Sequence, residues 1–486
     1  MVDAVGGAPM TYALARFLML TVLTACVTST GDPAEREVSA EVTARGPRVL
    51  AMDVGPGAGE TREAAVAKAQ GAGVTTVVLN YDWNELEPTA FQYQNARLIA
   101  DNAFYATSPH AMSIVLNIRP IAGACRVVPP DLATLAWNDP VMTTRFGYLL
   151  TWIHGYLPGV TVQVMSIGTE IDSNLAPADY AAYKGFFETA RNNAKSLWGA
   201  ALPVGTAVTW GSLTTPGPAQ AAILDLDEHA DRVLTTYYGI NPDLTVKDPY
   251  AGPVADIYAA LLAVDGNAKT RGHTIDLIEV GYPTSAALNS SQVHQQIFLS
   301  TMFGIWDAFY PRINTMVITW EADLSEYSAE SVAIGGWGGA CQAPAGAPPA
   351  TPAGLTVTPR GTPGTTTWQY YVVAVNASGN SVPGPIVTTT TGAAALSATS
   401  ANRLTWAAAA GATQYKVMRY AAGGTPAETG LIATTTATTL DDTGLASSTF
   451  IFQEFLRTLG YRTSTTPVTD KLGFTQIGTE AHARGW

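Results

Sequence analysis

The sequence has few charged residues and little basic charge. Only 13% of its 486 residues are charged, and 26 Lys plus Arg against 39 Asp plus Glu give a formal net charge of −13. No basic run could follow a phosphate backbone, so nucleic acid is not an expected partner. The 6 histidines show no ligand spacing, and we expect neither a metal site nor a cofactor. A composition poor in charge favours an uncharged, hydroxyl-rich substrate.

Cysteine is also scarce, and the first of the 3 cysteines stands in an informative place. The apolar stretch from Ala13 to Leu23 is too short to span a bilayer, and it leads into Leu23-Thr24-Ala25-Cys26, which resembles a lipobox. We predict a lipoprotein signal peptide over residues 1–26, lipidation of Cys26, and a linker over residues 27–46. The alternative is an ordinary cleaved signal with an incidental cysteine. The predicted location is the bacterial cell envelope, lipid-anchored in the periplasm or at the cell surface, or secretion.

The other two cysteines, Cys125 and Cys341, would then lie in an exported protein. Disulfides persist in such compartments. A bridge between these two residues and a pair of free buried thiols both stay open at this point, and the sequence indicates no oligomeric state.

From residue 47 the chain repeats a unit of a β-branched run, a polar loop and a segment with helical spacing. Helical spacing is clearest in Glu60 to Gln70, Pro177 to Lys195 and Ser291 to Ala308. This repetition predicts an α/β fold, a (β/α)8 TIM barrel over residues 47–343, with its active site at the carboxyl ends of the strands. The eight runs are Arg48 to Val54, Val74 to Asn80, Ser113 to Ile118, Val162 to Gly168, Val204 to Thr209, Val233 to Tyr238, Ile275 to Glu279 and Ile313 to Trp320. A doubly wound open sheet is the competing fold, but no glycine-rich phosphate loop follows the first run.

A Thr-rich segment over residues 344–447 has period-two runs and almost no helical signal, and it predicts a small β-sandwich. Tyr370 to Gly379 and Leu404-Thr405-Trp406 resemble fibronectin type III modules. Their order is reversed here, so a permuted or merely similar sandwich is equally plausible. Helical spacing returns from Phe450 to Leu459, and we assign residues 448–486 to the last barrel helix and the C-terminus. The sandwich is therefore predicted to be inserted between strand eight and helix eight.

Two glutamates follow apolar runs at the ends of strands four and seven, Glu170 and Glu279. A carboxylate is costly to bury without a partner or a role. Glycoside cleavage needs two carboxyl groups beside the scissile bond, one to protonate the leaving oxygen and one to attack or to activate water. Strands four and seven lie across a barrel from each other, so these residues are candidates for that pair. Structural ion pairs at the strand ends are the alternative.

Several motifs resemble glycoside hydrolase clan A, the retaining (β/α)8 enzymes. Ile167-Gly168-Thr169-Glu170-Ile171-Asp172 is similar to the segment that holds the acid/base of the clan, and Ile278 to Thr284 is similar to its nucleophile segment. Tyr81 to Pro88 resembles the Trp-x-x-Leu-Glu-Pro stretch after strand two. The resemblance covers roughly residues 47 to 330 and the last helix. It implies a glycosidase acting on β-linked oligo- or polysaccharide, with no cofactor.

The resemblance also implies roles for single residues. Glu170 becomes the acid/base and Glu279 the nucleophile, while Tyr237 or Tyr238 donates a hydrogen bond to the nucleophile. Trp320 matches the tryptophan under the first sugar subsite. Thr169 is a candidate substrate contact, because it stands where the clan has an Asn that contacts the sugar 2-hydroxyl. It departs from the clan, since a hydroxyl lacks the second group of an amide.

Further candidates surround this pair. Trp83, Trp210 and Tyr282 are possible stacking surfaces for sugar faces. Polar contacts could come from Asn80, Arg119 and Glu321, and structural roles are assigned to Asp53, Glu85 and Glu87. The competing function is a catalytically silent surface barrel that binds glycans. Apart from carbohydrate, the one expected partner is the membrane, through the lipid anchor.

Overall fold

The computed structural model describes residues 42–324, 349–376, 379–381, 383–421, 430–447, 450–464 and 466–486. The predicted signal peptide with Cys26 and most of the predicted linker lie outside the described residues. Cys125 is disulfide-bonded. Cys341, its candidate partner, also lies outside the described residues.

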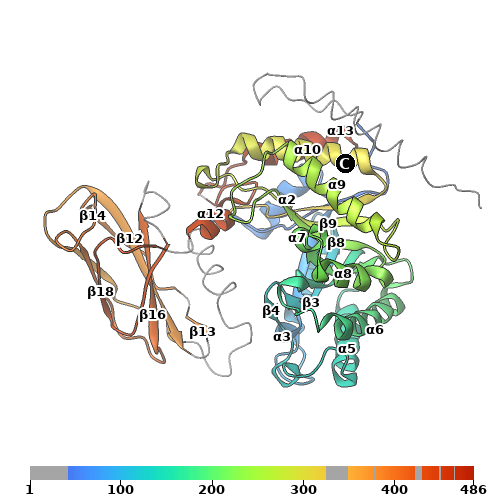
Figure 1. Ribbon diagram of the computed structural model, residues 1–486, viewed down its shortest axis with the longest axis horizontal. Helices are drawn as coiled ribbons and strands as arrows, with labels where there is room; N and C mark the ends of the chain where they lie inside the picture. The colour runs from blue at the N-terminus through green and yellow to red at the C-terminus, as the bar shows by residue number, and fades with distance from the viewer. Residues whose placement is uncertain are drawn as a thin grey trace, which may run out of the picture. The chain divides into compact units, whose positions relative to one another are not determined.

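Parallel strands form a barrel, as the repeated βα pattern predicts (Figure 1). Seven of its eight strand positions are single strands, and the fifth is split into β6 and β7, separated only by Thr206. The barrel closes through this split strand, because β6 pairs with β5 and β7 pairs with β8. The strands are β1 (Val49–Met52), β2 (Thr76–Asp82), β3 (Ser113–Ala122), β5 (Val162–Thr169), β6 (Val204–Gly205), β7 (Ala207–Thr209), β8 (Val233–Tyr238), β9 (Ile275–Gly281) and β10 (Ile313–Ile318). A short strand, β4 (Cys125–Arg126), pairs antiparallel with the end of β3.

Helices connect these strands, and the three segments predicted from helical spacing are confirmed as α2, α6 and α10. Their caps follow from the sequence: the hydroxyl of Thr61 accepts a hydrogen bond from the backbone N–H of Ala64, and that of Ser291 accepts one from His294. The helices are α2 (Arg62–Gly71), α3 (Trp83–Leu86), α4 (Ala96–Tyr105), α5 (Pro140–Tyr156), α6 (Tyr180–Trp198), α7 (Trp210–Thr214), α8 (Pro218–Leu226), α9 (Ala251–Gly266), α10 (Gln292–Phe309), α12 (Phe450–Thr458) and α13 (Leu472–Ala483).

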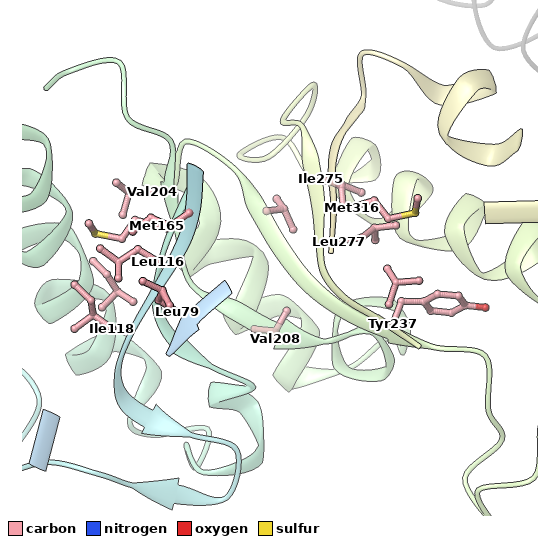
Figure 2. Close-up of a cluster of buried hydrophobic side chains, with 14 of the residues drawn as sticks. Leu79, Leu116, Ile118, Met165, Val204, Val208, Tyr237, Ile275, Leu277 and Met316 are labelled. Carbon is pink, nitrogen blue, oxygen red and sulfur yellow. The ribbon is translucent and has the colours of Figure 1, made fainter. Parts of the chain in front are cut away.

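Alternation along the strands divides the apolar residues into two cores. One core lies inside the barrel and contains strand residues only, namely Val49, Ala51, Val78, Val115, Val164, Ala207, Leu234, Ile278 and Val317. The other lies between the outer face of the strands and the helices, and Figure 2 shows members of it from Leu79 to Met316. Because successive strand side chains point to opposite faces, this division identifies which residues point into the barrel.

The helix that completes the barrel is α13, which lies later in the chain than the segment we predicted for it. Trp486 stacks on Trp306 of α10, and a Cβ added at Gly73, just after α2, would stand 2.8 Å from Ala481. The helix α13 therefore packs between α10 and α2, as an eighth helix must. The predicted segment from Phe450 is helical too, as α12, but it packs near the carboxyl ends of the strands.

The inserted β-sandwich is confirmed between β10 and the last helices. Trp368, Tyr370, Leu404 and Trp406 lie in one core shared by its two antiparallel sheets. One sheet contains β11 (Thr356–Pro359), β15 (Asn402–Thr405) and β18 (Thr439–Asp442). The other contains β12 (Thr366–Asn376), β13 (Gly379–Asn380), β14 (Val387–Gly392), β16 (Gln414–Ala421) and β17 (Gly430–Thr435).

Candidate active site

The inward row of side chains changes from apolar to polar at the carboxyl ends of the strands. On β8, for example, Leu234 lies in the interior core, and alternation then turns Thr236 and Tyr238 inward above it. Alternation on β2 and β3, together with residues just after β1 and β5 and one residue of β9, gathers one set of polar groups at this end of the barrel. The set comprises Asp53, Asn80, Asp82, Asn117, Arg119, Glu170, Thr236, Tyr238 and Glu279.

Glu279 reaches this set through an irregularity in β9. Leu277 is the register partner of Thr235 and Glu279 that of Thr236, so Ile278 is an extra residue, as in a β-bulge. Simple alternation would place Glu279 on the outer face with Leu277. The bulge turns it inward instead, where the phenol of Tyr238 donates a hydrogen bond of 2.6 Å to its Oε2.

Glu170 follows β5 in a left-handed backbone conformation, with φ 49° and ψ 46°. The chain turns sharply just before it at Gly168, where φ is +86° and a Cβ would stand 2.7 Å from the hydroxyl of Tyr183. The hydroxyl of Thr236 donates a hydrogen bond of 2.8 Å to Oε1 of Glu170. Two inward residues of β8, two positions apart, thus hold the two glutamates.

The two glutamates lie close enough to affect each other's ionisation. Burial and the negative charge of Glu170 raise the pKa of Glu279 to about 8, against the opposing effects of the hydrogen bond from Tyr238 and the charge of Arg119. Burial also raises the pKa of Glu170, and the hydrogen bond from Thr236 opposes it. The pair therefore holds on to one proton near neutral pH, because two adjacent carboxylates resist ionising together.

Asp53 and Asp82, which the sequence analysis did not place in the site, complete the acidic groups. Asp82 and Arg119 are register partners on β2 and β3 and form an ion pair of 2.6 Å. Burial raises the pKa of Asp53 to about 6, opposed by Arg119 and by a hydrogen bond from Trp320. Asp53 also raises the pKa of Glu279. Asp53 therefore lies beside the two glutamates, and its inward position at the end of the first strand was the available signal.

The segment after β2 is structural and not a sugar-binding surface. Trp83 is completely buried and donates a hydrogen bond of 2.8 Å to Glu87, so its predicted stacking role is wrong. Glu87 is itself buried against Arg145. Glu85 pairs with Arg97 at the surface, so both glutamates of this segment are engaged in ion pairs.

Three other aromatic candidates pack on the outer side of the strands. Tyr237 is completely buried and donates a hydrogen bond to Asp256, so of the two tyrosines it is Tyr238 that donates to Glu279. Tyr282 is also completely buried and donates to the backbone oxygen of Lys247. The indole of Trp210 donates to the backbone oxygen of Asp256. Neither tyrosine joins the inward polar set, and the complete burial of Tyr282 contradicts its predicted stacking on a sugar face. Trp210 is only partly buried, so its stacking role stays a prediction.

Two of the polar residues predicted to contact a sugar are buried, and a third belongs to the inward polar set. Glu321 is completely buried and pairs with Arg462 at 2.9 Å, so it cannot contact a sugar as predicted. Thr169 is buried as well, which removes the predicted contact between its hydroxyl and a substrate. Asn80 points inward and accepts a hydrogen bond of 2.8 Å from Asn117.

Within the described ranges, no group of three or more His, Cys, Asp or Glu side chains could hold a metal ion. Over the same residues, no helix is long and apolar enough to cross a membrane.

Neither a protein-family model nor a curated protein matches the chain. Among solved structures, the chain is similar to the exo-β-1,4-mannosidase Op5Man5 from Opitutaceae bacterium strain TAV5, with 14% identity and a TM-score of 0.44, covering 61% of this chain and only 56% of that one. It is also similar to GH5_18 from Bifidobacterium longum subsp. longum ATCC 55813, with 12% identity and a TM-score of 0.46, over 57% of this chain and 70% of that one. A third, β-glucosidase 1317, gives 13% identity and a TM-score of 0.41, over 53% of this chain and 76% of that one.

At such identities and TM-scores the likeness carries no argument about activity. The positions of the two glutamates come from the structure itself. A glutamate follows the fourth strand of the barrel, and another lies in the seventh.

Proposed function

We propose that the protein is a retaining glycoside hydrolase that cleaves β-linked oligo- or polysaccharide. One observation carries the proposal: Glu170 and Glu279 enter the same end of the barrel, each fixed by a hydroxyl of β8, and each carboxyl is within reach of the charge of the other. A pair of carboxyl groups that shares a single proton supplies both a proton donor and a nucleophile.

Two groups favour the ionised form of Glu279, against the opposing charges of Glu170 and Asp53. The phenol of Tyr238 keeps its proton, because burial and the charge of Glu279 raise its pKa, so it donates to the carboxylate. Arg119 adds a positive charge that also favours the ionised form of Glu279. At Glu170 the charge of Asp172 disfavours ionisation. The retaining mechanism requires the shared proton on Glu170, and the proposal assigns it there for that reason.

In the first step, a carboxylate oxygen of Glu279 attacks the anomeric carbon, the bond from this carbon to the leaving oxygen breaks, and Glu170 gives its proton to that oxygen. In the second step, Glu170 takes a proton from water, the resulting hydroxide adds to the anomeric carbon, and the ester bond to Glu279 breaks. Both carboxyl groups return to their starting states. The indole of Trp320 donates a hydrogen bond to Asp53, next to the two glutamates, and Trp320 is the residue proposed to stack on the first sugar.

The experiment is hydrolysis of a panel of aryl β-glycosides and β-linked polysaccharides by the protein lacking residues 1–26. Glu170→Ala and Glu279→Ala are expected to lose activity by several orders of magnitude on polysaccharide, whereas Glu85→Ala, a surface glutamate paired with Arg97, should keep it. Proton NMR of the first product should show retained anomeric configuration. An inverted product, or full activity in either glutamate variant, would overturn the mechanism.

A catalytically silent barrel that binds glycans is the second candidate. It is favoured by Thr169, whose buried hydroxyl replaces the amide that resembling enzymes use. On this reading the wild-type protein cleaves no member of the panel but still binds polysaccharide in affinity gel electrophoresis.

We also propose that the chain is exported and anchored to the cell envelope through a lipid on Cys26. The apolar stretch and lipobox-like residues before it support this proposal. In cells that express the full chain, Cys26→Ser should move the protein from the membrane fraction to the soluble fraction. Equal membrane association of both forms would contradict it.

A further inference from the structure

The helix α12, which follows the inserted sandwich in the chain, packs against the candidate active site. Phe455, Leu456 and Leu459 of this segment are buried in one cluster, against which Tyr238 and Trp320 also pack. The rings of Phe455 and Tyr238 meet edge to face, with their centroids 5.4 Å apart and an angle of 80°. This is a favourable aromatic geometry.

A second contact restrains Tyr238 from β9. Gly281 is the register partner of Tyr238, and a Cβ added there would stand 2.9 Å from Cε1 of Tyr238 and 2.7 Å from Leu459. The missing side chain thus leaves room for the tyrosine ring and for the end of α12. The ring of Tyr238 therefore lies between a glycine of the sheet and Phe455.

We propose that Phe455 is a positioning residue that holds the phenol of Tyr238 in its hydrogen bond with Glu279. The inference rests on the proposed function, in which Glu279 is the nucleophile. Phe455 does not touch the reacting atoms, and it acts through the orientation of Tyr238. The active site is then complete only when the segment beyond the inserted sandwich has packed onto the barrel.

The test compares Phe455→Ala with Leu456→Ala. Both side chains are buried to nearly the same degree in the same helix, at 6% and 5% exposure, but ring contact with Tyr238 belongs to Phe455. With thermal unfolding showing that both variants are folded, Phe455→Ala should lower kcat roughly 10- to 100-fold, because small misplacements of catalytic groups are costly. Leu456→Ala should change kcat less than threefold. Equal losses in the two variants would overturn the proposal.

A double-mutant cycle asks whether the effect passes through Tyr238. If it does, adding Phe455→Ala to Tyr238→Phe should cost little beyond the loss already caused by Tyr238→Phe. Additive losses would mean that Phe455 acts by another route and would refute the positioning role.

An additional readout does not depend on catalysis. The groups that face Glu279 are Glu170 from β5, Asp53 after β1, Arg119 of β3 and Tyr238 of β8. The hydrogen bond from Tyr238 lowers the pKa of Glu279. Because Phe455→Ala disturbs this bond, the pKa of Glu279 should rise in the variant.

Carbon-13 NMR of glutamate-labelled protein, with Glu279→Gln to assign the signal, measures this titration. An unchanged titration in Phe455→Ala refutes the positioning role even if the wild-type protein hydrolyses nothing. A raised pKa in a protein without activity would uphold the contact and reject the proposed function.

Discussion

The two hydroxyls of β8 should control opposite limbs of the pH profile of the enzyme. Thr236 donates to Glu170 and Tyr238 to Glu279, at 2.8 and 2.6 Å. Each bond stabilises the ionised form of its carboxyl and so lowers its pKa. Removal of either bond, by Thr236→Val or Tyr238→Phe, raises the pKa of the carboxyl that it served.

The size of the shift follows from the strength of such bonds. A hydrogen bond to a charged group contributes about 1.5–3 kcal/mol. Since one pKa unit corresponds to about 1.4 kcal/mol, each variant should move one limb upward by about one to two units. Activity requires the singly protonated pair, so the acid limb reports protonation of Glu279 and the basic limb reports loss of the proton from Glu170. Tyr238→Phe should raise the acid limb and Thr236→Val the basic limb.

The assay is kcat/KM for an aryl β-glycoside from pH 4 to about pH 10, a range wide enough to record both limbs. Thr235→Val is the matched control, because its buried hydroxyl donates to the backbone oxygen of Thr236 and not to a carboxyl. An upward shift of the acid limb in Thr236→Val, with the basic limb moving in Tyr238→Phe, would refute the assignment of roles. Unshifted limbs in both variants would refute the electrostatic reasoning itself.

Two further predictions concern stability. Arg462→Ala should lower the free energy of unfolding by about 3–5 kcal/mol in chemical denaturation, because it leaves Glu321 buried without its partner; a loss below about 1 kcal/mol would contradict this. Asp227 is completely buried, neither of its carboxyl oxygens has a hydrogen-bond partner among the described residues, and burial raises its pKa well above the usual value. Stability should therefore fall as the pH rises above the unfolded pKa of about 3.9, and the gain in melting temperature from Asp227→Asn should grow with pH. A gain that is constant from pH 4 to about pH 9 would contradict this account.

The strands, the inserted sandwich and the two glutamates could be predicted because each leaves a local pattern. Apolar runs followed by a carboxylate identify Glu170 and Glu279 as strand-end residues. The direction in which a side chain points is harder to predict from the sequence. Strict alternation would have turned Glu279 outward, and it was the bulge at Ile278 that brought it into the barrel.

The roles predicted for several aromatic residues were wrong for the same reason. Tyr237 and Tyr238 are neighbours with the same side chain, and they differ only in direction. Tyr237 packs on the outer side of the strands, and Tyr238 donates a hydrogen bond to Glu279. Trp83 and Tyr282 lie in motifs typical of active sites, but burial, which depends on tertiary packing, decides their roles. The sequence also gave no means of distinguishing α12 from α13 as the closing helix, because both are apolar on one face.

The position of the insertion has a consequence for the order of folding. About 150 residues separate the end of β10 at Ile318 from the start of α13 at Leu472. During synthesis, α13 therefore cannot complete the barrel before the whole sandwich has been made. If the sandwich folds first, its ends are brought together and the entropy cost of joining α13 to α10 and α2 falls. The inserted module would then act as an internal folding aid, and variants that unfold it should slow the refolding of the barrel without altering the barrel's own contacts.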